Sequence, residues 1–196
     1  MVSAKIEHVR DDIIILKPVY TETGDATQVY LKDLSSFIDP RIIKSAVKAL
    51  VRSYAIDLKA QRQMLGSHLG RKAVMPFYLG NNRVFVPIKM RNVIVESDPT
   101  YGYLDVLYLS RVEAVEKNRS RVILSNGMEL EAYSHQATVL QSQHLGVMVL
   151  GLLEKSQEKD ETEEVLVQSS RMLAQALERI SKQLERIENK LSLIRN

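Results

Sequence analysis

The apolar residues of one stretch, DPRIIKSAVKALVRSYAIDLKAQRQML at 39–65, recur with the period of an α-helix. The repeat stops at the first glycine of the next segment, GSHLGRK at 66–72. Asp39 can accept hydrogen bonds from free amides at a helix start, and Pro40 has the backbone angle that suits a first helical position. The sequence therefore predicts one helix of about 25 residues that ends before Gly66.

One side of this predicted helix is basic. With an advance of 100° per residue, six cationic side chains fall within about 80° of one another, opposite the apolar face. Helix faces exposed to water usually mix acidic with basic residues, because like charges three or four positions apart repel each other. We interpret the face as a polyanion-binding stripe, and a merely solvated face is the alternative. The stripe consists of Arg41, Lys44, Lys48, Arg52, Lys59 and Arg62.

The residues on both sides of the predicted helix have the pattern of strands. Short runs of β-branched and aromatic residues alternate with turn residues before residue 39 and again from 74 to 133, and Asn126-Gly127 is a strong hairpin signal. A further helix is expected at about 135–153. We predict an α+β fold with a β-rich body and a long basic amphipathic helix at 1–153, a charged linker at 154–161, and a C-terminal coiled-coil helix at 162–196.

Positive charge is concentrated in one part of the chain. Residues 41–91 contain eleven lysines and arginines and a single acid, Asp57, so the segment has a formal charge of +10, whereas the whole chain has +3. A block of one sign attracts polyanions. Beyond the stripe, the block contains Arg71 and Lys72 in the glycine-rich segment, then Arg83, Lys89 and Arg91. We expect the stripe to contact DNA phosphates, and Arg71, with Arg83 or Arg91, to enter a groove.

Four segments resemble the competence transcription factor (ComK) family. They are ILKP at 15–18, GSHLGRK at 66–72, VFVPI at 84–88 and SNGMELE at 125–131. The resemblance implies a DNA-binding protein that acts as an oligomer on paired A/T-rich boxes, approaches the minor groove and activates genes for DNA uptake. The long helix and the coiled-coil tail depart from the family pattern.

The last helix has a heptad repeat of apolar residues. Leu177, Leu184 and Leu191 occupy the a positions, and the d positions hold Leu166, Leu173, Ile180, Ile187 and Ile194. Leucine at a with isoleucine at d favours assemblies larger than a parallel dimer, so a homotetramer is predicted and a trimer is the second choice. A helix folded back on its own domain is the alternative, and the parallel or antiparallel direction stays open.

Composition and motifs exclude several classes of function. The chain has no cysteine, which excludes disulfides and cysteine-ligated zinc or iron–sulfur sites. The first residues lack an apolar run of signal-peptide length, and the longest apolar run, at 145–153, is too short to span a bilayer, so we expect a cytoplasmic protein with no membrane contact. No catalytic motif occurs, and the four histidines show no metal-ligand spacing. We therefore expect neither enzyme activity, nor a metal site, nor a cofactor.

Two functions remain. The first is a sequence-preferring, DNA-binding transcriptional regulator of the competence-factor type that binds double-stranded, A/T-rich DNA as an oligomer. The second is a structural or adaptor protein that is assembled by its coiled coil and binds an acidic protein partner with its basic face.

The heptad repeat generates a test of assembly. Truncation after Glu158 should convert the tetramer or trimer into a smaller species, and Leu184→Lys should do the same because a charge would be buried against its own copies in the partner helices. Sedimentation velocity on the full-length and altered chains measures the mass. An unchanged mass after truncation would mean that the body itself oligomerises.

Overall fold

The computed structural model of the protein describes residues 5–71, 73–93, 98–155, 166–173 and 178. The chain divides into two compact units, Met1–Leu152 and Leu153–Asn196. The first unit contains both helices and antiparallel sheets, so the predicted α+β class is confirmed. Across the described residues, no helix has the length and apolar character needed to cross a membrane.

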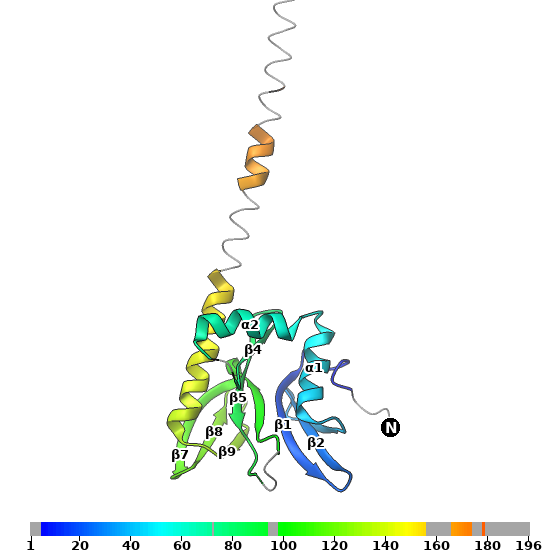
Figure 1. Ribbon diagram of the computed structural model, residues 1–196, viewed down its shortest axis with the longest axis vertical. Coiled ribbons are helices and arrows are strands. Elements are labelled where there is room, and N and C mark those ends of the chain that lie inside the picture. Colours follow the sequence, from blue (N-terminus) through cyan, green and yellow to red (C-terminus); the bar gives the residue numbers. More distant parts are fainter. Residues whose placement is uncertain (1–4, 72, 94–97, 156–165, 174–177, 179–196) are drawn as a thin grey trace, which may run out of the picture. The chain divides into compact units, whose positions relative to one another are not determined.

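The larger sheet has six antiparallel strands (Figure 1). Its order is β3-β2-β1-β6-β5-β4, so strands from the start and the middle of the chain meet where β1 pairs with β6. The alternation of the sequence predicted most of these strands, but it missed β3. The strands are β1 Ile13–Thr21, β2 Gly24–Leu31, β3 Ser36–Asp39, β4 Phe77–Leu79, β5 Arg83–Lys89 and β6 Tyr101–Asp105.

The smaller sheet has three antiparallel strands, in the order β7-β8-β9. The strands are β7 Leu109–Glu116, β8 Arg119–Leu124 and β9 Glu129–Ala132, and the short 3₁₀ helix η1, Val106–Tyr108, connects β6 to β7. The predicted Asn126-Gly127 hairpin joins β8 to β9. Gly127 has a φ of 84°, a left-handed conformation that glycine adopts without strain.

The single long helix predicted from Pro40 to Leu65 is wrong. The chain forms two helices, α1 Ile43–Ser53 and α2 Leu58–Leu69. Ala55, between them, takes a left-handed φ of 56° that no continuous helix contains. Asp57 starts α2, because its carboxylate accepts hydrogen bonds from the amides of Lys59 at 2.8 Å and Ala60 at 3.1 Å. This N-cap was the sequence signal for the break.

Both ends of the predicted helix also differ. Asp39 belongs to β3, where it pairs with Thr27, and it does not cap α1, which starts four residues later. At the other end α2 continues through Gly66 to Leu69, and Gly70 ends the helix with a left-handed φ of 62°. The predicted glycine loop is therefore mostly helical.

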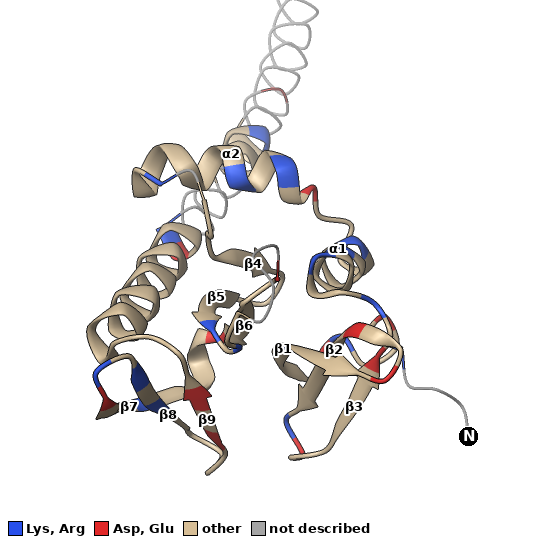
Figure 2. Cartoon of the chain, turned by 60° about the horizontal axis from the view of Figure 1, so that its bottom comes forward, with Lys and Arg blue, Asp and Glu red and all other residues tan. Residues whose placement is uncertain are grey.

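The core lies between α1 and the larger sheet. In Figure 2, α1 is seen end-on beside β1 and β2. The apolar face of α1 packs against residues from β1, β2, β4 and β5, and Ile6 from the N-terminal segment is buried in the same cluster. The cluster comprises Ile6, Ile13, Leu16, Val29, Ile43, Ala46, Val47, Leu50, Val51, Phe77, Leu79 and Phe85.

A third helix occupies residues 136–155, which includes the region of the predicted 135–153 helix. Its buried residues Val139, Leu145 and Val149 lie on one face. Side chains of the same helix bind the backbone of the smaller sheet, since the Gln136 amide donates to the Val112 carbonyl at 2.8 Å. The predicted linker at 154–161 thus begins within a helix, and its residues 156–161 lie outside the described residues.

The predicted coiled coil lies mostly outside the described residues. Residues 166–173 are helical, and Leu166 and Leu173 are 63% and 66% exposed in the single chain. The other heptad residues are not among those described: Leu177, Ile180, Leu184, Ile187, Leu191 and Ile194. Assembly through this helix stays a prediction.

Two glycines of the 136–155 helix form a matched pair for a test of packing. A Cβ at Gly146 would lie 2.5 Å from Val86 Cγ1 and 3.0 Å from Val106 Cγ2, whereas a Cβ at Gly151 would meet nothing within 4 Å. Gly146→Ala should therefore lower the free energy of unfolding by about 1–2 kcal/mol, because the clash exceeds the gain in helix propensity. Gly151→Ala should raise it by up to about 1 kcal/mol. Urea denaturation measures both, and a stabilising Gly146→Ala would contradict the close contact of this helix with β5.

Candidate nucleic-acid interface

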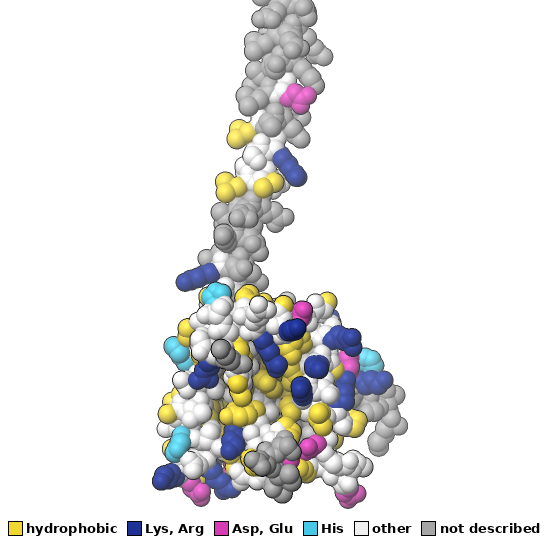
Figure 3. Space-filling view, viewed as in Figure 1, with side chains coloured by type: hydrophobic (Ala, Val, Ile, Leu, Met, Phe, Trp, Pro, Cys, Tyr) yellow, Lys and Arg dark blue, Asp and Glu magenta, His cyan; other side chains and the backbone are white. Residues whose placement is uncertain are grey.

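A hollow of about 1070 Å³ lies at the corner between α1 and α2. Both helices contribute basic side chains to it, and Figure 3 shows lysines and arginines gathered on this face around a group of apolar side chains. Although the predicted helix is broken, stripe residues from α1 and from α2 line the same hollow. Its basic lining residues are Arg41, Lys48, Arg52, Lys59 and Arg62.

A second, smaller hollow of about 410 Å³ adjoins the first. Lys48 and Arg62 line both hollows, and Lys44 lines the smaller one. Its other residues are largely apolar or aromatic and come from α1, α2, β6 and the segments that precede β4 and β6. We call the two hollows together the α1–α2 cleft.

Five cations of the cleft are exposed to solvent: Lys44, Lys48, Arg52, Lys59 and Arg62. Within the part of the chain that the structure describes, none of them forms an ion pair. Several basic residues elsewhere on the described surface do form ion pairs. On the smaller sheet, for example, Arg119 lies 3.4 Å from Glu131 and Arg121 lies 3.5 Å from Glu129.

Arg41 differs from the rest of the stripe because it is engaged in ion pairs. Its guanidinium donates to Asp39 at 2.6 Å and to Glu7 at 2.6 Å. The same hydrogen bond from Arg41 lowers the pKa of Glu7 to about 2. Arg41 thus joins the N-terminal segment to the start of α1, and the prediction that it is a phosphate ligand is not supported by this geometry.

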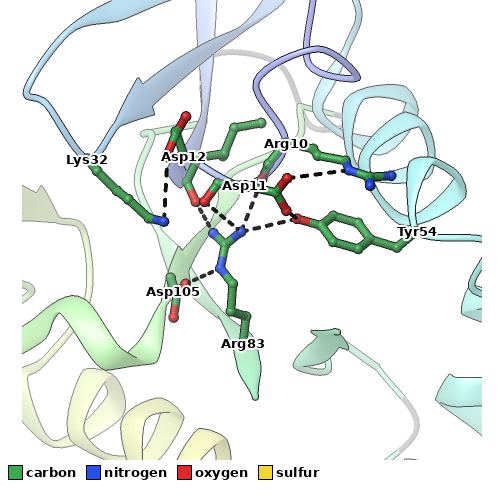
Figure 4. Close-up of polar contacts among 8 residues, drawn as sticks. Arg10, Asp11, Asp12, Lys32, Tyr54, Arg83 and Asp105 are labelled. Carbon is green, nitrogen blue, oxygen red and sulfur yellow. Dashed lines mark hydrogen bonds and ion pairs between the residues drawn. The ribbon is translucent and has the colours of Figure 1, made fainter. Parts of the chain in front are cut away.

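The corner between α1 and α2 is held by the N-terminal segment (Figure 4). Tyr54, at the end of α1, donates its hydroxyl to the Asp11 carboxylate at 2.6 Å. Arg10 donates to the Ser53 carbonyl, and its guanidinium lies 4.7 Å from the centre of the Tyr54 ring. Burial and the Asp11 carboxylate raise the pKa of Tyr54 to about 12, so its hydroxyl stays a donor at neutral pH. These contacts fix the direction in which the chain leaves α1.

Arg83 is not a groove reader, because its side chain is buried. It lies 8% exposed on β5, and its Nε donates to the Asp105 carboxylate at 2.9 Å. Its other nitrogens donate to the carbonyls of Arg10, Asp11 and Ile13 (Figure 4). The positive charge of Arg83 is therefore paired inside the protein, and its guanidinium connects β5 and β6 to the N-terminal segment.

Arg91 is also buried, and it too is wrongly predicted as a DNA contact. Its guanidinium donates to Asp25 at 2.7 Å, lies 3.9 Å from Asp98, and stacks 3.9 Å from the centre of the Tyr20 ring. The positive charge counted for residues 41–91 thus includes side chains that neutralise acids from the flanking segments.

The other three predicted contacts have different positions. Arg71 is half-buried just after Gly70, where α2 ends. Lys89 is half-buried at the end of β5, and it lines a separate polar hollow with Lys117 and Arg119. Lys72 lies outside the described residues.

Two parts of the site have no clear signal in the local sequence. The contacts of Asp11 with Tyr54 and Glu7 with Arg41 span 43 and 34 positions, and no local pattern marks such distant pairs. The aromatic wall of the smaller hollow, Tyr101 and Tyr103, comes from β6, and only Tyr103 fell within a predicted strand. Among the described residues, no three histidine, aspartate or glutamate side chains are grouped so as to hold a metal ion.

No protein-family model, curated protein or solved structure matches the chain. The resemblance to the competence transcription factors therefore stays a prediction from the four segments.

The buried position of Arg83 can be tested against an exposed arginine of the cleft. Arg83→Met should lower the free energy of unfolding by about 3–5 kcal/mol, because the Asp105 carboxylate, 1% exposed, would lose its partner. Arg52→Met should change it by less than about 1 kcal/mol, since Arg52 is exposed in the last turn of α1. Guanidinium chloride denaturation measures both variants. Equal stability of the two would contradict the structural role of Arg83.

Proposed function

We propose that the protein binds DNA, and that the α1–α2 cleft contacts the phosphate backbone. The observation that carries the proposal is the group of five exposed cations without a carboxylate partner among the described residues. Unpaired lysines and arginines side by side repel one another and cost stability, and a bound polyanion relieves that cost. Arginine and lysine are also the side chains that most often contact phosphate.

The acids of the cleft do not cancel its charge. Glu7 is paired with Arg41, and Asp98 faces Arg91. Asp57 uses its carboxylate to cap α2. The exposed charge along the cleft is therefore positive, as a surface for phosphates requires.

The role in the cell is proposed from sequence alone. A sequence-preferring transcriptional regulator of the competence-factor type fits the resemblance in the four segments, and the heptad repeat would supply the oligomer. An oligomer that presents several clefts to one DNA makes its second contact at high effective concentration, so paired sites would be favoured over single ones. With Arg83 and Arg91 buried, Arg71 is the remaining described arginine of the predicted groove readers.

The proposal predicts a steep dependence of affinity on salt. Five phosphate contacts should give a log–log slope of about −4 to −5 for duplex DNA, since each contact contributes about −0.9. The double variant Lys48→Ala/Arg52→Ala should reduce the slope by about 2 and weaken binding to every duplex alike. Fluorescence anisotropy over a range of salt concentrations measures both effects.

The matched control is Arg121→Ala, which removes an exposed arginine of the smaller sheet that pairs with Glu129. It should leave the slope unchanged. Absence of binding at 50 mM salt to both duplex and single-stranded DNA would refute the proposal. Retention of an acidic polypeptide under the same conditions would then favour the adaptor alternative.

A further inference from the structure

The smaller hollow of the cleft has features that phosphate binding does not require. Its volume, about 410 Å³, lies in the range of pockets that enclose organic ligands. Apolar side chains form most of its lining, whereas a phosphate site would need only polar donors. The apolar and aromatic lining residues are Ile43, Val47, Leu58, Ala73, Val74, Met75, Pro99, Tyr101 and Tyr103.

The two tyrosines give this hollow an aromatic wall on β6. The Tyr103 ring packs edge-on against Phe77, with the ring centres 5.1 Å apart, and Phe77 is stacked on Phe85 at 5.2 Å. Burial raises the pKa of Tyr103, and the neighbouring Arg62 guanidinium partly offsets that rise. Ring packing thus holds Tyr103 in place, whereas Tyr101 is 38% exposed.

Three cations also line the smaller hollow. Lys44 and Lys48 come from α1 and Arg62 from α2, and the last two also line the larger hollow. A strand whose phosphates lie along the larger hollow would thus pass beside the smaller one. Aromatic rings beside a basic groove are the combination with which proteins bind unpaired nucleotides, because bases stack on the rings while the phosphates contact the cations.

We infer that the smaller hollow receives an unpaired base of the bound DNA strand, stacked on Tyr101. The inference rests on the proposed function and specifies the form of the DNA. In a paired duplex each base is stacked between its neighbours and is closed off from such a hollow. The cleft would therefore prefer a single strand, or a duplex with an unpaired base, over a fully paired duplex.

The experiment compares three DNAs of equal length by fluorescence anisotropy with the full-length chain. They are an oligothymidylate, a duplex with one unpaired thymidine, and the fully paired duplex. The first two should bind more tightly than the third. Tyr101→Ala should weaken binding of the first two by about 5- to 150-fold, the loss expected for one stacked base, and leave the paired duplex unchanged. Tyr101→Phe, which keeps the ring, should bind all three DNAs as the unaltered chain does.

The outcomes separate the inference from the proposed function. A paired duplex that binds as tightly as the other DNAs would overturn the inference and leave DNA binding by the cleft in place. The same holds if Tyr101→Ala weakens all three equally, because the ring would then support the fold or the electrostatics and not a base. Failure of all three DNAs to bind would overturn both. Circular dichroism of the Tyr101 variants establishes that each is folded.

Discussion

The Arg83 guanidinium is the contact on which the rest of the body depends. From β5 it binds the Asp105 carboxylate of β6 and three backbone carbonyls of residues 10–13, and it lies 3.3 Å from the Tyr54 hydroxyl. Burial raises the pKa of Asp105, and the hydrogen bond from Arg83 partly offsets that rise. What the arrangement supplies is geometry: one planar group with fixed donor directions sets the N-terminal segment, the two strands and the end of α1 relative to one another.

The cleft follows from that geometry. Asp11 and Arg83 hold Tyr54 at the end of α1, the chain turns at Ala55, and Asp57 caps a second helix that starts at Leu58. A continuous helix would have spread the cations along one line. The break places cations from both helices around two adjoining hollows, with the aromatic residues of β6 beside them. Repulsion among the cleft cations lowers the stability of the fold, and burial of the apolar cluster between α1 and the sheet offsets that cost.

The sequence predicted the parts of the fold that depend on local pattern. The alternation of apolar and polar residues located most strands. Asn81-Asn82 and Asn126-Gly127 occur at hairpin turns, where Asn81, Asn82 and Gly127 take a left-handed backbone conformation. The helix break at Ala55 was missed because the apolar period continues across it, and only the capping role of Asp57 indicates a new start. The charge pattern indicated this region but could not separate exposed cations from buried ones. Asp105 lies 22 positions from its partner Arg83, and Asp25 lies 66 positions from its partner Arg91. Such distant pairs are set by strand order, which a single sequence does not specify.

Under the proposed function, nucleic acid lies along the α1–α2 cleft. Lysine footprinting tests this placement, because acetylation reports the accessibility of each ammonium group in the full-length chain. Lys44, Lys48 and Lys59 line the cleft, whereas Lys32 and Lys117 are exposed on other parts of the body. With saturating oligonucleotide, acetylation of the three cleft lysines should fall several-fold, while acetylation of Lys32 and Lys117 should stay the same. Protection of Lys117 with the cleft lysines still reactive would contradict it.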